Sequence, residues 1–225
     1  LSLYSFMVAS RESDIVEAEL VNSGEANFLA SSKGHEGSVI IAPFLQKSDW
    51  LHCHYRDKAL MLARGISNEM FLYSALCKAE SHSAGRQMVS HMSAPELNVL
   101  SLVGPVGNNA LQATGIAYAI KEENDNPLIY CSVGDGTSQQ GEVLEAIAEA
   151  KRSNLPVLFF IHNNNLAIST RTEGKTFFSR PDGFVDSFYD IPITYINGSN
   201  ALAEVAKAET VIKEIRTNRT PQIIV

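Results

Sequence analysis

The chain has 225 residues, of which 45% are apolar and 19% charged, and this length supports one sizeable core. We therefore expect a single domain over residues 1–225. The 18 basic and 25 acidic residues give a net charge of −7, and no basic cluster exceeds a Lys-Arg pair, so nucleic acid is not an expected partner. No apolar run reaches the roughly 20 residues that a membrane-spanning helix needs, so a membrane is not expected either.

The chain contains three cysteines, Cys53, Cys77 and Cys131. An odd number makes a disulfide framework a poor interpretation and favours a reducing compartment. The first residue is Leu1 rather than Met, and residues 1–20 read as an amphipathic helix without the regions of a signal peptide. Residues 223–225 have the pattern of a buried strand. We interpret the sequence as cut from a longer chain at both ends.

Helical periods alternate with short apolar runs, an order that predicts an α/β fold with a mostly parallel sheet and helices on both faces. Helices are expected at residues 3–21, 35–45, 68–79, 108–121, 142–152 and 201–216. Strands are expected at residues 127–133, 157–162, 193–196 and 222–225, which are nearly uniform in apolar character. The segments 80–100 and 169–190 remain unassigned, and both exceed the usual loop length.

One expected strand runs directly into Gly134-Asp135-Gly136, and a helix follows. Open α/β sheets bind ligands at the carboxyl ends of their strands, where glycines let backbone N–H groups approach a phosphate. A nicotinamide-dinucleotide fingerprint needs a third glycine where Gln139 stands, which disfavours a nicotinamide-dependent oxidoreductase. Asp135 instead indicates a divalent metal that bridges protein and diphosphate, because magnesium needs few protein carboxylates when phosphates complete its shell.

A second expected strand, residues 157–161, ends at His162 and three asparagines. If the two strands are parallel neighbours, Asp135 and these asparagines lie at the same edge of the sheet. An asparagine carbonyl supplies a neutral oxygen ligand, which suits a magnesium site.

The pair Gly134-Asp135-Gly136 and Asn163-Asn164, 26 residues apart, resembles the thiamine diphosphate and magnesium signature. Further segments extend the resemblance over essentially the whole chain: Gly34-His35-Glu36-Gly37, His54-Tyr55-Arg56-Asp57, Gly85-Arg86-Gln87-Met88, Gly104 to Asn109, and Asn163 to Thr170. These segments narrow the resemblance to the alpha subunit of the thiamine diphosphate-dependent decarboxylating component of 2-oxo acid dehydrogenase complexes. Gly-Arg-Gln-Met followed by His91 resembles the branched-chain, 2-oxoisovalerate type.

The resemblance implies a magnesium site and an aminopyrimidine site. Asp135, the side chain of Asn164 and the backbone carbonyl of Leu166 would bind Mg²⁺. The backbones of Gly104 and Val106 match positions that hydrogen-bond the aminopyrimidine of thiamine diphosphate.

The resemblance also implies a diphosphate site. Tyr55 and Arg56 match the pair that holds this group, and the rigid guanidinium fork suits phosphate oxygens. Gly136 and Thr137 would offer backbone N–H groups to the same phosphates. His162 stands where branched-chain members carry Arg, which leaves the diphosphate with one fewer permanent charge.

The implied activity is oxidative decarboxylation of a branched-chain 2-oxo acid, with acyl transfer to a lipoyl group. The expected partners are a beta subunit or fused beta half, without which the chain would be inactive, and a lipoyl acyltransferase. No catalytic residue is assigned, because the family's loop histidine would follow Val225. The expected location is the cytoplasm of a bacterium or the mitochondrial matrix of a eukaryote.

Two alternatives remain open: a pyruvate- or acetoin-type dehydrogenase alpha chain, and a non-catalytic assembly chain of the same fold. Asn108-Asn109 departs from the family pattern and leaves open whether a monovalent cation binds there. Residues 170–175 are polar and make a poor core, so we expect residues 171–180 to be mobile or held by another chain when the cofactor is absent.

Overall fold

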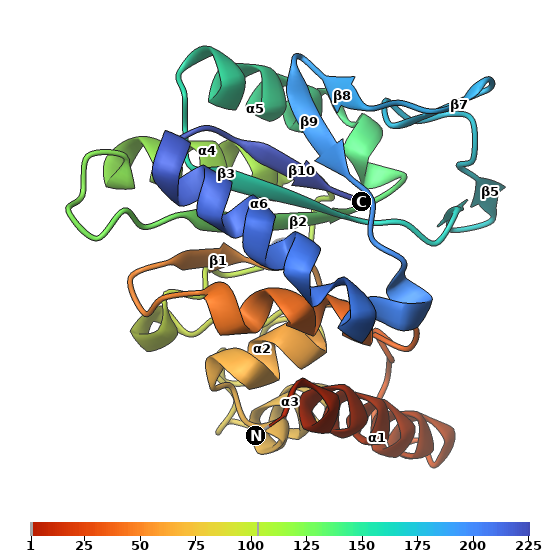
Figure 1. The fold of residues 1–225 in the computed structure, drawn as a ribbon. Helices are drawn as coiled ribbons and strands as arrows, with labels where there is room; N and C mark the ends of the chain where they lie inside the picture. Colours follow the sequence, from red (N-terminus) through yellow and green to blue (C-terminus); the bar gives the residue numbers. More distant parts are fainter. Residues whose placement is uncertain (1, 103) are drawn as a thin grey trace. The chain divides into compact units, whose positions relative to one another are not determined.

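Figure 1 shows the fold from a computed structural model, which describes residues 2–102 and 104–225. The chain divides into two compact units. Unit 1 comprises the described residues of the ranges 1–45, 53–104 and 197–206; unit 2 comprises residues 46–52, 105–196 and 207–225. Within the described part of the chain, no helix combines the length and apolar character that crossing a membrane requires.

Unit 2 is built on a six-stranded sheet with the order β1-β2-β3-β10-β9-β8. Its strands are β1 (Trp50–His52), β2 (Ile129–Gly134), β3 (Val157–His162), β8 (Ser187–Phe188), β9 (Ile191–Thr194) and β10 (Gln222–Ile224). All neighbours are parallel except β8 and β9, which are antiparallel. The predicted mostly parallel α/β sheet is thus confirmed, although β1 and β8 were not predicted and β9 begins two residues earlier than expected.

The strands at the centre of this sheet are covered on both faces. Every residue of β3 and the first five of β2 are buried, and successive side chains point to opposite faces. The helices of this unit are α4 (Asn108–Ile120), α5 (Gly141–Arg152) and most of α6 (Val205–Asn218). Figure 1 draws α6 across the front of the strands, and its buried residues are Ala208, Val211, Ile212 and Ile215.

Unit 1 is mostly helical. Its elements are α1 (Leu3–Asn22), η1 (Glu36–Phe44), α2 (Lys58–Arg64), α3 (Asn68–Ala75), η2 (Pro95–Leu97) and η4 (Gly198–Glu204). The segment expected as a helix at 35–45 is a 3₁₀ helix that contains Pro43, whose ring and missing N–H oppose an α-helix interior. Helix α2 was not predicted, since seven residues span only two turns and give little periodicity.

Helix α1 buries polar side chains instead of an apolar stripe. Its buried residues are Ser10, Ser13, Asp14 and Glu17, whereas Tyr4, Val8, Ile15 and Val16 are exposed. The prediction of an ordinary amphipathic helix was therefore wrong for the described residues of this segment, and Leu1 lies outside them. Because buried charges need partners, α1 requires charged or hydrogen-bonding groups beneath it.

The unassigned segment 169–190 forms short antiparallel pairs in unit 2. Strands β4 (Leu166–Ala167) and β5 (Thr170–Arg171) pair, as do β6 (Ser179–Arg180) and β7 (Gly183–Phe184). Within residues 170–175, expected to make a poor core, Thr172 is the one buried residue, whereas Thr176, Phe177, Phe178 and Ser179 directly after them are buried. The Phe177 ring stacks on Phe188 with centroids 4.4 Å apart, and such contacts give the segment a core of its own. The expected mobility stays a prediction.

Candidate cofactor and metal site

Asp135 lies at the carboxyl end of β2, at the sheet edge where a ligand is expected. The strand register pairs Gly134 with His162, and the Asp135 N–H donates to the His162 carbonyl at 3.0 Å. The residue is 3% exposed. Its Oδ1 accepts from the Gly136 N–H at 2.9 Å, and its Oδ2 accepts from Thr172 Oγ1 at 2.6 Å. These contacts fix the carboxylate at the edge while leaving about two of its four acceptor positions for another ligand.

Gly136 permits a close approach of backbone that a larger residue would block. A Cβ placed on Gly136 would lie 2.5 Å from the Cβ of Ala167 in the β4–β5 hairpin. The hairpin therefore packs directly against the turn after β2. Half-buried Thr137 follows and begins the 3₁₀ helix η3 (Thr137–Gln139), which leads into α5.

The asparagines after β3 form two consecutive turns closed by their own side chains. Asn163 Oδ1 accepts from the Asn165 N–H at 3.1 Å, and Asn164 Oδ1 accepts from the Leu166 N–H at 3.0 Å. Asn165 has φ of 59°, a left-handed conformation that asparagine tolerates. Asn164 and Leu166, the predicted magnesium ligands, are both exposed and lie in one turn that follows the strand next to Asp135.

His162 is buried at 5% exposure rather than presented to solvent. Its ring centroid lies 5.1 Å from that of Phe160, and its carbonyl accepts from Asp135. Its clearest contribution to this edge is therefore the backbone contact that sets the position of Asp135. A role of its side chain toward diphosphate remains a prediction.

The start of α4 supplies the remaining predicted residues of unit 2. Val106 is 55% exposed, and Gly107 has φ of 90°, which favours glycine. Asn109 is buried, and its Nδ2 donates to the Ser132 carbonyl at 2.9 Å, so this side chain ties α4 to β2.

Tyr55 and Arg56 belong to unit 1, where they lie side by side before α2. The Arg56 Cζ lies 5.0 Å from the centroid of the Tyr55 ring, and Arg56 Nη1 donates to the Ser31 carbonyl at 2.8 Å. The Tyr55 ring also stacks on His91 at 6.1 Å. Gly104, predicted at the aminopyrimidine, is an exposed residue of the same unit.

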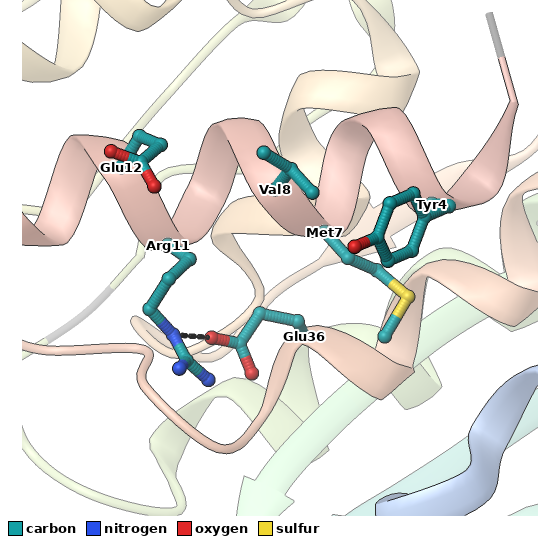
Figure 2. Close-up of a pocket in the computed structure, with 6 residues that line it drawn as sticks. All are labelled: Tyr4, Met7, Val8, Arg11, Glu12 and Glu36. Carbon is teal, nitrogen blue, oxygen red and sulfur yellow. Dashed lines mark hydrogen bonds and ion pairs between the residues drawn. The ribbon is translucent and has the colours of Figure 1, made fainter.

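A cavity of about 240 Å³ lies along α1 in unit 1, and Figure 2 shows its lining. Tyr4, Met7 and Val8 form its apolar part, and an ion pair of 2.6 Å joins Arg11 Nε to Glu36 Oε1. Glu36 comes from the Gly34-His35-Glu36-Gly37 segment, and its other oxygen accepts from the Gly34 N–H at 2.9 Å. The carboxylate of this segment therefore joins α1 to the following loop, and the cavity contains no predicted cofactor residue.

Sequence reasoning missed several residues that hold the site residues in place. Thr172 contacts Asp135 from 37 positions away, and Ser31 contacts Arg56 from 25 positions away. Neither belongs to a local motif; the polar composition of residues 170–175 was the one signal for Thr172, and the sequence offered none for Ser31.

The donor set at the Asp135 edge fits magnesium. A buried carboxylate, an exposed amide side chain and a turn backbone offer oxygen ligands only, which is what Mg²⁺ prefers. Among the described residues no three His, Cys, Asp or Glu side chains gather as a metal cluster. Because Mg²⁺ needs only one or two protein carboxylates when phosphates complete its shell, the carboxylate of Asp135 meets this requirement.

The sequence profile of the dehydrogenase E1 component matches residues 4–224. The chain belongs to this family, which has a thiamine diphosphate-binding fold. The resemblance drawn from the motifs is thereby confirmed at the level of the family.

The relatives of this chain point to the branched-chain type. It is 32% identical over 174 residues to the mitochondrial 2-oxoisovalerate dehydrogenase subunit alpha of Caenorhabditis elegans, covering 76% of this chain and 40% of the relative. The mouse protein of the same name is 28% identical over 206 residues, covering 90% and 46%, and subunit alpha 1 of Arabidopsis thaliana is 27% identical over 225 residues, covering 99% and 47%. The chain thus spans less than half the length of each of these relatives.

Proposed function

We propose that this chain provides the diphosphate- and magnesium-binding half of a thiamine diphosphate-dependent 2-oxo acid dehydrogenase. The activity is oxidative decarboxylation of a branched-chain 2-oxo acid with transfer of the acyl group to a lipoyl group. The single observation that carries the proposal is the register of β2 and β3, which brings buried Asp135 beside the turns of Asn163 to Leu166.

In this proposal Asp135, Asn164 Oδ1 and the Leu166 carbonyl ligate Mg²⁺. The backbone N–H groups of Gly136, which also donates to Asp135 Oδ1, and of Thr137 bind the diphosphate, and their place directly after β2 supports this role because open α/β sheets bind ligands at the carboxyl ends of their strands. When bound, thiamine diphosphate supplies the electron sink that decarboxylation of a 2-oxo acid requires.

Arg56 and Tyr55 hold the diphosphate in the same proposal. Tyr55 packs against Ala30, Ala75 and Val89, which fixes the aromatic ring, and Arg56 lies against that ring. A guanidinium fixed in this way loses little side-chain entropy when it binds an anion. His162 and the backbones of Gly104 and Val106 complete the proposed contacts with diphosphate and aminopyrimidine.

The proposed partners and substrate follow the names of the relatives. A protein called subunit alpha has at least one other subunit, which supports a beta partner and a site that is inactive without it. The name 2-oxoisovalerate dehydrogenase supports a branched-chain substrate and acyl delivery to a lipoyl acyltransferase. Because these relatives are named mitochondrial, the matrix is the proposed location for a eukaryotic source.

Titration calorimetry tests the proposal on the full-length protein with its partner subunit. Thiamine diphosphate should bind only with Mg²⁺ present, and NAD should not bind. Asp135→Asn should weaken binding at least about 30-fold, because loss of a buried anionic ligand costs more than about 2 kcal/mol. Glu145→Gln, on the exposed face of α5, is the charge-matched control and should bind normally. Equal affinity of Asp135→Asn and the parent would reject the site.

Substrate turnover by the same assembly tests the finer part of the proposal. A preference for 2-oxoisovalerate over pyruvate is expected, though one or two methylene groups discriminate by only about 1–3 kcal/mol each. A tenfold preference for pyruvate would favour the pyruvate-type alternative. Cofactor binding without any turnover would favour the assembly chain.

A further inference from the structure

A buried group of three charges lies beneath α1 in unit 1. Lys58 is fully buried, and its Nζ lies 2.6 Å from Asp14 Oδ1 and 2.6 Å from Glu17 Oε1. Burying such charges costs several kcal/mol of desolvation for each ion, and apolar residues of similar volume often give equal or greater stability. Stability alone therefore does not explain why α1 carries two acids here.

The two acids differ in what else they contact. Asp14 Oδ2 accepts from Ser31 Oγ at 2.7 Å and from the Ser32 N–H at 2.7 Å, and its Oδ1 accepts from Ser32 Oγ at 3.2 Å. Glu17 Oε1 accepts from Ser13 and Lys58, and within the described residues its Oε2 has no partner. Only Asp14 thus reaches the loop that follows α1.

The Ser31–Ser32 peptide group connects Asp14 to Arg56. Its N–H donates to Asp14 Oδ2, and its carbonyl accepts from Arg56 Nη1 at 2.8 Å. Hydrogen bonds at the two ends of one peptide group fix its plane and polarise each other. Of the five N–H donors of the Arg56 guanidinium, this bond occupies one, and no other described residue accepts from the group.

We propose that Asp14 is a positioning residue for Arg56, acting through the Ser31–Ser32 peptide to fix the guanidinium for a diphosphate. The inference rests on the proposed function, which gives Arg56 its ligand. Burial by itself raises the pKa of Asp14, but the charge of Lys58 and hydrogen bonds from Lys58, Ser31 and Ser32 lower it below its ordinary value. Asp14 therefore stays ionised at neutral pH and accepts all these bonds.

The structure offers a matched pair of variants for the test. Asp14→Asn and Glu17→Gln each remove one carboxylate of α1 from Lys58, and each leaves Lys58 one acid. Only Asp14→Asn disturbs the Ser31–Ser32 peptide. In the full-length protein with its partner subunit and Mg²⁺, the Kd of thiamine diphosphate should rise about tenfold in Asp14→Asn and less than twofold in Glu17→Gln.

A comparison of two ligands separates positioning from general damage. In the proposed function Arg56 binds the diphosphate, which carries more charge than a monophosphate, so Asp14→Asn should reduce the preference for thiamine diphosphate over thiamine monophosphate. Structural damage would weaken both ligands alike and leave that preference unchanged. If circular dichroism shows that Asp14→Asn does not fold, Ser31→Ala serves as the second variant. It removes one hydrogen-bond donor to Asp14, so its Kd for thiamine diphosphate should rise about threefold, with the same reduction in preference.

The possible outcomes separate a failure of this inference from a failure of the proposed function on which it rests. If the parent protein binds thiamine diphosphate and both acid variants bind it with equal affinity and preference, Asp14 does not position Arg56. If the parent protein does not bind thiamine diphosphate with Mg²⁺, the proposed function is wrong and the inference, which depends on it, is overturned as well.

Discussion

The Asp135 edge of unit 2 and the Arg56 site of unit 1 are held in place by different means. At the Asp135 edge, two neighbouring parallel strands set the geometry, because their ladder places residue 134 opposite residue 162. At the Arg56 site, side chains far apart in the sequence set it, since Ser31 lies 25 positions from Arg56 and Asp14 lies 44 positions from Lys58. The Asp135 edge thus depends mainly on backbone pairing, with one side-chain hydrogen bond from Thr172, whereas the Arg56 site depends on buried charge.

This difference predicts different sensitivities to mutation. Most hydrogen bonds in the sheet join backbone groups, which remain whatever the side chains are. The charge cluster depends on three side chains, and loss of Lys58 leaves two acids buried without their cation. The Arg56 site should therefore be the more fragile of the two.

The largest expected effect is that of Lys58→Met. The substitution leaves Asp14 and Glu17 buried without their cation, and breaking a buried pair in this way costs about 3–5 kcal/mol. Urea unfolding measures the loss, with the exposed Lys213→Met as control. Hydrogen exchange should rise in α1 and α2 but not in β2 and β3. A uniform rise throughout the protein would contradict the separation of the two sites.

A smaller effect is expected from Gly136→Ala, which tests the backbone approach at the Asp135 edge. The new Cβ would meet the Ala167 Cβ at 2.5 Å, and overpacking of this kind costs about 1–3 kcal/mol. Affinity for thiamine diphosphate with Mg²⁺ should fall about tenfold or more. The double variant Gly136→Ala, Ala167→Gly removes the opposing Cβ and should recover most of that loss. Failure of this rescue would show that the clash is not the cause.

Thr172→Val comes next, because it removes one hydrogen bond and keeps the shape of the side chain. Thr172 Oγ1 donates to Asp135 Oδ2 at 2.6 Å, and a bond to a charged acceptor contributes about 1.5–3 kcal/mol when both groups are buried. We expect weaker magnesium-dependent binding and faster hydrogen exchange over residues 171–180. Addition of cofactor and partner should slow that exchange in the parent. Equal, strong protection with and without them would contradict the expected ordering of this segment.

Local sequence patterns predicted where Asp135 lies in the fold but not the side chains that hold Asp135 and Arg56 in place, and one physical reason explains both outcomes. Uniform apolar runs predict covered parallel strands, and a turn after such a strand has a defined place, so Asp135 and Asn164 could be placed from local patterns. The partners of Lys58 could not, because a salt bridge over 44 positions leaves no local pattern. Helix α1 was predicted to be amphipathic because its apolar residues recur at helical spacing. That spacing does not show which face is buried, and Tyr4 and Val8 are in fact exposed.

The smallest and most specific expectation concerns the pH dependence of stability in Glu17→Gln. Burial raises the pKa of Glu17 above its ordinary value, and Lys58 only partly opposes this. A carboxyl with a raised pKa contributes stability that is present below the unfolded pKa of about 4.5 and is lost as pH rises through the folded pKa. Glutamine cannot ionise, so the free energy of unfolding of Glu17→Gln should increase relative to that of the parent as pH rises above about 4.5. The sign is opposite for Asp14, whose lowered pKa contributes stability that is lost only as pH falls below its unfolded value near 3.8. Urea unfolding of the parent and Glu17→Gln from pH 4 to pH 8 measures the difference, and a difference that stays constant or reverses would show that Lys58 holds Glu17 ionised as firmly as it holds Asp14.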